Sequence, residues 1–154
     1  MPVYEISDRV DYSAQQMFDM VADVASYHEF LPLCTKSDVY DLTIDDDGVK
    51  QFKAALRIER KSLKISETFI SNVVVNPNRM TVVSKSNGGP IKQLTNSWRF
   101  IENGQGDCHT KMVLDFEMSS LPLRLLMKAS FDLVMGKLTS SFEKRAAELY
   151  GKPD

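Results

Sequence analysis

The hydrophobic pattern changes its period once along the chain, near residue 119, and this change limits the folds that the chain can adopt. Before that point, apolar and polar residues alternate in segments separated by turn residues, which is the pattern of strands. After it, apolar residues recur at helical spacing, with Pro122 in the first turn and Gly151 at the end. They form one helix stripe that is expected to pack on the sheet, namely Leu123, Met127, Phe131, Val134, Leu138, Phe142 and Leu149. We therefore expect a sheet followed by one long helix that packs on it.

The segments of period two number about seven and are joined by short turns, which predicts an antiparallel sheet. The turn at 45–48, with the sequence DDDG, predicts a hairpin between two of them. The expected strands cover residues 3–12, 37–44, 51–58, 63–75, 80–84, 91–102 and 108–118.

A short helix is expected directly after the first strand. Ser13, followed three residues later by Gln16, has the pattern of a capping box. Met17 and Val21 then recur at helical spacing, so a helix over about residues 14–25 is predicted. Together with the sheet and the C-terminal helix, this order of elements belongs to the α+β class.

The composition is that of an ordinary globular domain. The 154 residues are enough for one domain with a core, and we expect a single domain over 1–154. The net charge of -2 gives no indication of DNA as a partner. No apolar run approaches the ~20 residues that span a bilayer, and the start lacks a secretory pattern, so a cytoplasmic location is expected.

The sequence shows no set of catalytic residues with a recognisable spacing, and an enzyme is not expected. His28 and His109 are interpreted as surface or packing residues. An enzyme, the remaining alternative, would need an acid or base on the inner side of the sheet. By alternation, Glu67, Asp115 and His109 are expected to face outward, which argues against it unless a strand bulge shifts the register. The acidic turn at 45–48 lacks the ligand spacing of a calcium loop and is interpreted as a solvated turn.

Metal and disulfide sites are not expected either. Cys34 and Cys108 are far apart and form no C-x-x-C pair, so two buried free thiols and no cofactor are predicted. A basic cluster is interrupted by Glu59 and Glu67 and is interpreted as a solvated strand edge, with phosphate contact as the alternative. Its members are Arg57, Arg60, Lys61 and Lys64.

The connection at residues 27–34, with the sequence YHEFLPLC, is unusually apolar and is called the apolar connection below. Connections are normally polar because their backbone groups need water, so this one is expected to cover an apolar space. The chain also has eight methionines, which suit irregular apolar space. We expect a cavity between sheet and helix with this connection as its lid; the alternative is that the side chains fill one another.

Three segments resemble the coenzyme Q-binding proteins of the START-like (Bet v 1-like) superfamily, which is grouped with the polyketide cyclase/dehydrase domains. They are YHEFLPLCTKSDV from residue 27, GPIKQLTNSWRF from residue 89 and FEKRAAELYG from residue 142, and the resemblance extends over nearly the whole chain. It implies a helix-grip fold, in which a curved antiparallel sheet wraps around the long C-terminal helix. It also implies non-catalytic binding of ubiquinone or another isoprenoid quinone in a hydrophobic tunnel, in support of respiration. Bacterial relatives in the same family are described as a ribosome association toxin that keeps the ribosomal subunits apart, so a ribosomal subunit is the alternative partner.

The expected ligand-binding residues come from the apolar connection, the inner strand faces and the helix stripe. A buried head-group carbonyl would need a donor, for which Trp98, Tyr27 and Asn96 are candidates. The full set is Tyr27, Phe30, Leu31, Leu33, Cys34, Phe52, Phe69, Asn96, Trp98, Phe116, Met127, Phe131, Val134 and Leu138.

A membrane contact is a further hypothesis, because the tripeptide LPL occurs both at 31–33 and at 121–123. Both segments are expected near the cavity mouth, where apolar tips beside basic residues suit reversible docking at the respiratory membrane. The residues concerned are Leu31, Leu33, Leu121 and Leu123, with Arg124 and Lys128 near the head groups.

Overall fold

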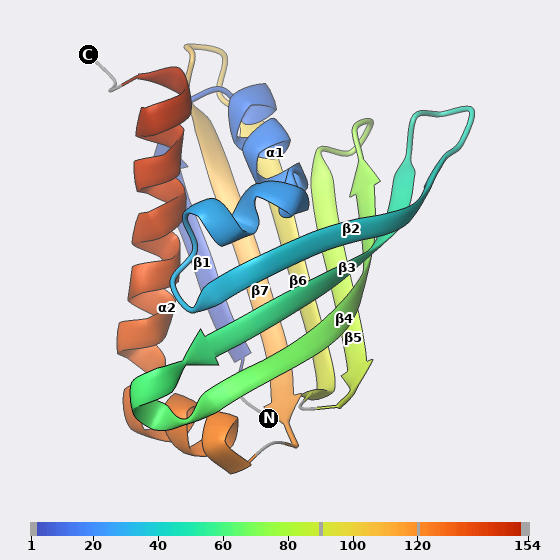
Figure 1. Cartoon of the computed structure of the whole chain (residues 1–154). Coiled ribbons are helices and arrows are strands. Elements are labelled where there is room, and N and C mark those ends of the chain that lie inside the picture. The colour runs from blue at the N-terminus through green and yellow to red at the C-terminus, as the bar shows by residue number, and fades with distance from the viewer. Residues whose placement is uncertain (1–2, 90, 120, 152–154) are drawn as a thin grey trace.

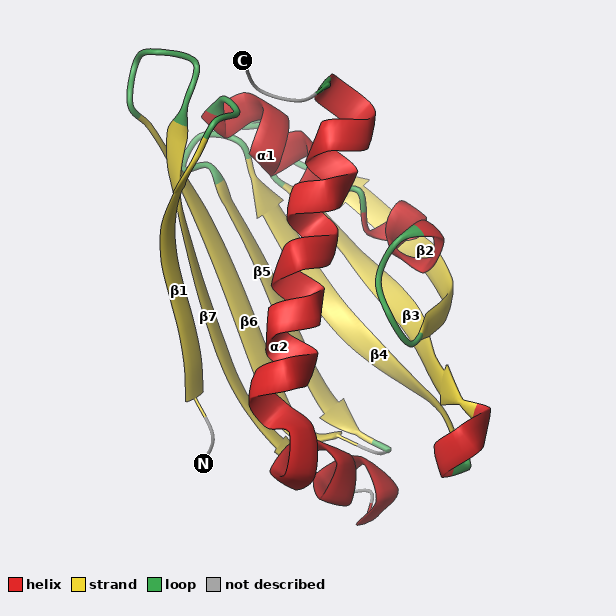
Figure 2. Ribbon diagram, turned by 90° about the vertical axis from the view of Figure 1, so that its left-hand side faces the viewer, coloured by secondary structure: helices red, strands yellow, loops and turns green. Residues whose placement is uncertain are grey.

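The computed structural model describes residues 3–89, 91–119 and 121–151. Within these residues, seven strands form one antiparallel sheet in the order β1-β7-β6-β5-β4-β3-β2, and a long helix lies along its inner face (Figures 1 and 2). This is the expected α+β arrangement. The elements are β1 (Val3–Val10), α1 (Ala14–Ala22), η1 (Val24–Glu29), β2 (Cys34–Ile44), β3 (Lys50–Arg60), η2 (Lys61–Leu63), β4 (Ile65–Asn76), β5 (Thr81–Gly88), β6 (Ile91–Glu102), β7 (Cys108–Met118) and α2 (Leu121–Tyr150).

The predicted capping box is confirmed at the start of α1. Ser13 Oγ accepts a hydrogen bond from the Gln16 N–H at 3.1 Å, and Gln16 Oε1 accepts one from the Ser13 N–H at 2.9 Å. The helix ends at Ala22, earlier than predicted, and the chain continues in the 3₁₀ helix η1. This tighter helix leads directly into the apolar connection.

Strand β5 is longer than predicted and continues past residue 84 to Gly88, although residues 86–90, SNGGP, have the composition of a tight turn. Ser86 lies within this extension, is buried, and shares a hydrogen bond between hydroxyl groups with Ser71 of β4. Because the Ser86 hydroxyl is hydrogen-bonded across the sheet, it does not need the water that a solvated turn would provide.

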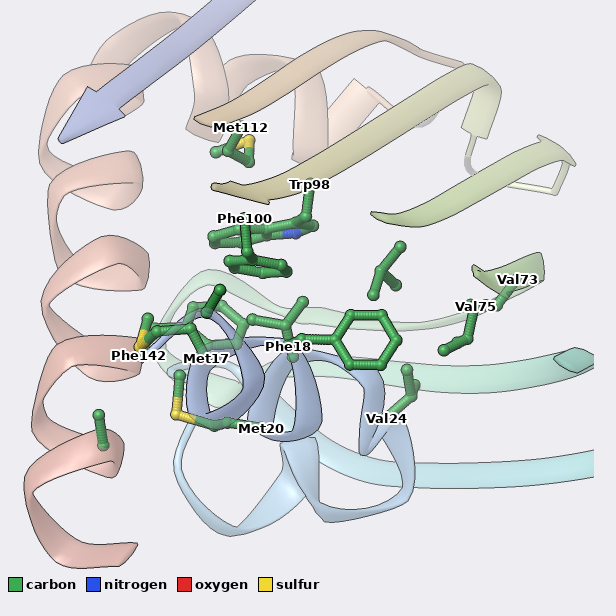
Figure 3. Packing of buried hydrophobic residues seen from close by; sticks show 14 of the residues in the cluster. Met17, Phe18, Met20, Val24, Val73, Val75, Trp98, Phe100, Met112 and Phe142 are labelled. Carbon is green, nitrogen blue, oxygen red and sulfur yellow. The ribbon is translucent and has the colours of Figure 1, made fainter. Parts of the chain in front are cut away.

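The core at one end of the sheet is built from aromatic rings and from α1 (Figure 3). The ring of Phe18 in α1 meets that of Phe100 in β6 edge to face, with centroids 6.3 Å apart. Trp98 stacks on Phe100 and contacts Phe142 of α2 at 5.1 Å between centroids. Helix α1 therefore closes this end of the space between sheet and α2.

Helix α2 ends as the sequence predicts, because Gly151 takes a φ of +84° and its N–H bonds to the Ala147 carbonyl at 2.9 Å. Phe142 and Ala146 are buried against the sheet. Leu149, which was placed on the packed stripe, is 48% exposed, so that assignment is wrong. Tyr150 makes the contact with α1 instead, donating a hydrogen bond to the Gln16 carbonyl at 2.8 Å.

Other predicted members of the helix stripe cannot be compared with the structure. The side chains of Leu123, Met127, Phe131 and Val134 lie outside the described residues. In the part of α2 that is described, Met135 is a buried residue that the predicted stripe omitted. None of the helices in the described part of the chain combines the length and the hydropathy of a bilayer-spanning segment.

Candidate functional site

A cavity of about 240 Å³ lies between the inner face of the sheet and α2. Strands β3 to β7 form its floor, α2 contributes Met135, Leu138, Thr139 and Phe142, and the apolar connection forms one side. The predicted hollow is therefore present. An apolar cavity of roughly 150 Å³ holds a benzene molecule in other proteins, so this one has room for a ring-sized group.

Most of the predicted site residues are brought together at this cavity. They come from the apolar connection, three strands and α2, segments that are far apart in the sequence. The predicted residues that line it are Tyr27, Leu31, Leu33, Cys34, Phe69, Asn96, Trp98, Phe116 and Leu138.

Phe30 and Phe52 lie elsewhere. Phe52 is 7% exposed and packs within the hydrophobic core. Phe30 packs against Phe142, and the guanidinium of Arg145 lies 5.2 Å from the centre of its ring. The remaining predicted residues, Met127, Phe131 and Val134, have side chains outside the described set.

Backbone hydrogen bonds hold the apolar connection in place. The Leu31 N–H donates to the Tyr27 carbonyl at 2.9 Å, and the Leu33 carbonyl accepts from the Glu59 N–H of β3 at 2.9 Å. Leu33 has a φ of 70°, in the left-handed region that large aliphatic residues rarely adopt. The connection is apolar because Leu31, Leu33 and Cys34 form part of the cavity wall.

Two of the three expected hydrogen-bond donors are already engaged within the protein. The Tyr27 hydroxyl donates to the Val21 carbonyl, and burial raises the pKa of this phenol well above its usual range. Trp98 Nε1 donates to Asn96 Oδ1 at 2.8 Å. The third, the amide nitrogen of Asn96, has weaker contacts, at 3.1 Å to the sulfur of Met112 and 3.4 Å to the carbonyl oxygen of Val113.

Sequence reasoning missed the other polar residues of the cavity wall, Ser71, Ser84 and Thr139. Ser71 and Ser84 occupy inward-facing positions of β4 and β5. The pattern that could have identified them is a serine in the apolar register of a strand, such as Ser71 between Phe69 and Val73.

Glu67 was expected to face outward, but it faces inward, and the alternation along β4 explains why. It pairs with Ile58 of β3 in the same register that places Phe69 opposite Leu56, so it shares the inner face with these residues. Its Oε2 atom is buried and has no hydrogen-bond partner among the described residues. Asp115 does face the outer side, where it accepts a hydrogen bond from Gln93 Nε2 at 3.2 Å.

The two LPL segments lie at different places along α2. Pro32 borders a surface groove with Leu133 and Lys137, part-way along the helix. Residues 121–123 begin the helix near the opposite end of the sheet from α1 (Figures 1 and 2). The two segments do not form the single entrance that we expected.

Residues 10–143 match the model of the family described as polyketide cyclase/dehydrase and lipid transport. The chain belongs to this family. The ribosome association toxin RatA of Escherichia coli K12 is 31% identical over 150 residues, which cover 97% of this chain and 90% of the toxin. The mitochondrial coenzyme Q-binding protein COQ10 of Drosophila melanogaster is 30% identical over 154 residues, 97% of this chain and 60% of that protein. The solution structure of CC1736 from Caulobacter crescentus has a TM-score of 0.77 at 27% identity and covers 99% of this chain and 100% of CC1736.

In this member of the polyketide cyclase/dehydrase and lipid transport family, the histidines lie away from the cavity wall. His28 Nδ1 is 2.8 Å from Ser37 Oγ, and His109 Nε2 is 2.6 Å from Ser7 Oγ on the outer side of the sheet. Among the described residues, no group of three or more His, Cys, Asp or Glu side chains could hold a metal ion.

The cysteines of this family member are both free thiols. Cys108 is completely buried, as predicted, whereas Cys34 is only half-buried, because it stands at the cavity wall. Burial raises the pKa of both thiols, so each is a weaker nucleophile at neutral pH than an exposed cysteine.

Proposed function

We propose that the protein binds an isoprenoid quinone such as ubiquinone in the cavity, without catalysis, and that it supports respiratory electron transport in this way. The observation that carries the proposal is the apolar cavity of about 240 Å³ between sheet and α2. Each methylene buried there contributes roughly 0.8 kcal/mol, so an isoprenoid tail can supply most of the affinity. The likeness to a coenzyme Q-binding protein supports the choice of ligand.

The chemistry of the wall supports binding rather than catalysis. Among the described lining residues there is no Asp, Glu, His, Lys or Arg. A general acid or base would have to lie within hydrogen-bond reach of the bound molecule. The ionisable lining groups, Tyr27 and Cys34, both have pKa values raised by burial and stay neutral near pH 7.

The test is to purify the protein from its native cells, extract it with organic solvent and identify bound lipid by mass spectrometry. We expect close to one quinone per chain. As a comparison, Leu138→Trp on α2 should fill the cavity and reduce the bound quinone, while circular dichroism shows an intact fold. A wild-type protein that carries no lipid, and that gains none when incubated with quinone-containing vesicles, would contradict the proposal.

A second candidate function is binding to a ribosomal subunit, which the likeness to the toxin over 90% of its length favours. The exposed basic residues around η2, namely Arg60, Lys61 and Lys64, are the surface that would contact ribosomal RNA. Co-sedimentation with purified subunits should then weaken with rising salt and with Lys61→Glu/Lys64→Glu. A matched control is Lys85→Glu on β5, another exposed lysine.

For loading from a membrane, we propose that the first turns of α2 contact the bilayer surface. Leu121 and Leu125 are each 57% exposed, and Arg124 and Lys128 beside them are exposed as well. Leu121→Ser/Leu125→Ser should therefore weaken binding to anionic vesicles. Leu149→Ser, which changes an exposed leucine at the other end of α2, serves as the control. Equal binding of both variants would contradict this contact.

A further inference from the structure

We infer that Ser84 and Asn96 form a pair of hydrogen-bond donors on the cavity floor that binds a neutral carbonyl oxygen of the ligand. The inference rests on the proposed function, because it concerns the same cavity. The donor pair would determine which end of a ligand lies deepest in the cavity and which ligands are preferred.

The sheet register places the two side chains side by side. Ser84 of β5 and Asn96 of β6 are directly paired residues, and both line the cavity. Directly paired residues have Cβ atoms ~4.5–5.5 Å apart on the same face, so the two side chains border the same part of the cavity floor. Val73 and Val82 beside the pair are apolar, and the hydroxyls of Ser71 and Ser86 on the same face are bonded to each other. The pair is therefore a small polar site in a mostly apolar wall.

Trp98 fixes the orientation of the Asn96 amide. An indole N–H can only donate, so the atom that receives its 2.8 Å hydrogen bond must be the amide oxygen of Asn96. Trp98 is itself held by its stack on Phe100 and by Phe142 (Figure 3). The amide nitrogen is therefore the side of Asn96 that can donate to a ligand.

The present partners of that nitrogen are poor. It lies 3.1 Å from the sulfur of Met112, a weak acceptor, and 3.4 Å from the carbonyl oxygen of Val113, at the long limit of a hydrogen bond. A ligand oxygen at normal hydrogen-bond distance would be a better acceptor than either.

Ser84 contributes the second donor of the pair. Its hydroxyl has no hydrogen-bond partner among the described residues, whereas the nearby hydroxyls of Ser71 and Ser86 bond to each other. A hydroxyl that faces an apolar space without a partner is unfavourable, and a ligand oxygen would satisfy it.

The surroundings restrict the acceptor to a neutral oxygen. No cationic side chain occurs among the described lining residues, so a carboxylate or phosphate would be buried here without a counter-charge. A ring carbonyl fits this site, and the rest of the ligand fits the apolar wall.

The experiment compares two probes with the same alkyl tail, a decyl-substituted benzoquinone and decylbenzene, which lacks the ring oxygens. Binding is followed by the fluorescence of Trp98, the single tryptophan of the chain, which lines the cavity. We expect wild-type protein to prefer the quinone. Ser84→Ala should weaken quinone binding about 3- to 10-fold, the effect of one hydrogen bond, and leave decylbenzene binding unchanged.

Thr139→Val is the matched control. Thr139 also lines the cavity, but its hydroxyl already donates to the Met135 carbonyl at 2.9 Å, so its removal should not change the preference for the quinone.

A second measurement, independent of any variant, is the infrared carbonyl band of the bound quinone. In wild-type protein this band should lie at lower wavenumber than in a hydrocarbon solvent.

The outcomes separate this inference from the proposed function. Equal losses for both probes in Ser84→Ala, or an unshifted carbonyl band, would overturn the donor pair. Wild-type protein that binds both probes equally well would also overturn it, while the apolar binding cavity would stand. Wild-type protein that binds neither probe would overturn both.

Discussion

Phe30 and Phe142 pack edge to face, with ring centroids 5.3 Å apart and an interplanar angle of 77°. Tyr27 completes a cluster of three rings, at 5.9 Å from Phe30 and 5.6 Å from Phe142. The apolar connection is thereby attached to α2 beside the cavity. Phe30 does not line the cavity, so its role is to hold the wall against the helix.

Phe30→Ala should therefore loosen the apolar connection. We expect a loss of about 2 kcal/mol in the free energy of unfolding, less than the ~3–5 kcal/mol of a fully buried phenylalanine, because Phe30 is half-buried. Hydrogen exchange measured by mass spectrometry should be faster at residues 27–34. Tyr40→Ala, at an exposed aromatic residue of β2, is the control and should change stability by less than about 0.5 kcal/mol. Unchanged exchange in Phe30→Ala would contradict the holding role.

The apolar connection shows how far the sequence could be interpreted. Its large side chains have no reason to lie in an exposed loop, so a covered apolar space could be predicted. The orientation of each side chain could not, because it depends on the left-handed backbone of Leu33 and on the bond from Glu59. Phe30 was thus assigned to the cavity although it turns toward Phe142 and Arg145.

Glu67 provides a second prediction, because its Oε2 atom is buried without a hydrogen bond among the described residues. Glu67→Met keeps the length of the side chain and removes the unsatisfied oxygen. We expect the free energy of unfolding in urea to rise by about 1 kcal/mol. Glu5→Met, at an exposed position of β1, should change it by less than about 0.5 kcal/mol. A loss of stability in Glu67→Met would mean that the carboxylate makes a favourable contact.

The polar residues of the cavity illustrate the limit of pattern reasoning. Strand alternation places Asn96 and Trp98 on one face, and both do line the cavity. It cannot tell that Trp98 donates to Asn96, because neighbouring inward residues of one strand bond only when their rotamers allow it. The two serines of this site, Ser71 and Ser84, escape notice because serine is common in turns as well as in strands.

Cys34 leads to a prediction about pH. The thiolate is the reactive form, and burial raises the pKa of this thiol, so N-ethylmaleimide should react more slowly than with free cysteine at pH 7.5. The rate should continue to rise at alkaline pH where that of free cysteine has levelled off. Saturating quinone should slow the reaction further, because Cys34 lines the cavity. Peptide mass spectrometry identifies the modified residue, and the fully buried Cys108 should stay unmodified as an internal control. Labelling that quinone leaves unchanged would place the ligand away from the apolar connection.

The size of the cavity predicts how affinity depends on tail length. At about 240 Å³ it is smaller than the ~300–1,000 Å³ of typical small-molecule sites, so it can enclose the ring and only the start of an isoprenoid tail. In a series of ubiquinones, the first prenyl unit should strengthen binding by at least about tenfold, since each buried methylene contributes roughly 0.8 kcal/mol. Units beyond the second or third should add little, because they extend past the wall into solvent or lipid.

The series can be measured by quenching of Trp98 fluorescence at a fixed detergent concentration. Leu138→Trp reduces the enclosed volume from the side of α2, so the affinity should level off at a shorter tail in this variant. The fluorescence of the variant is calibrated separately, because it contains a second tryptophan. Affinity that rises evenly through the longest tails would mean that sheet and helix separate to admit the whole chain. Affinity that does not depend on the tail would mean that the apolar wall does not bind it, and the proposed quinone site would have to be abandoned.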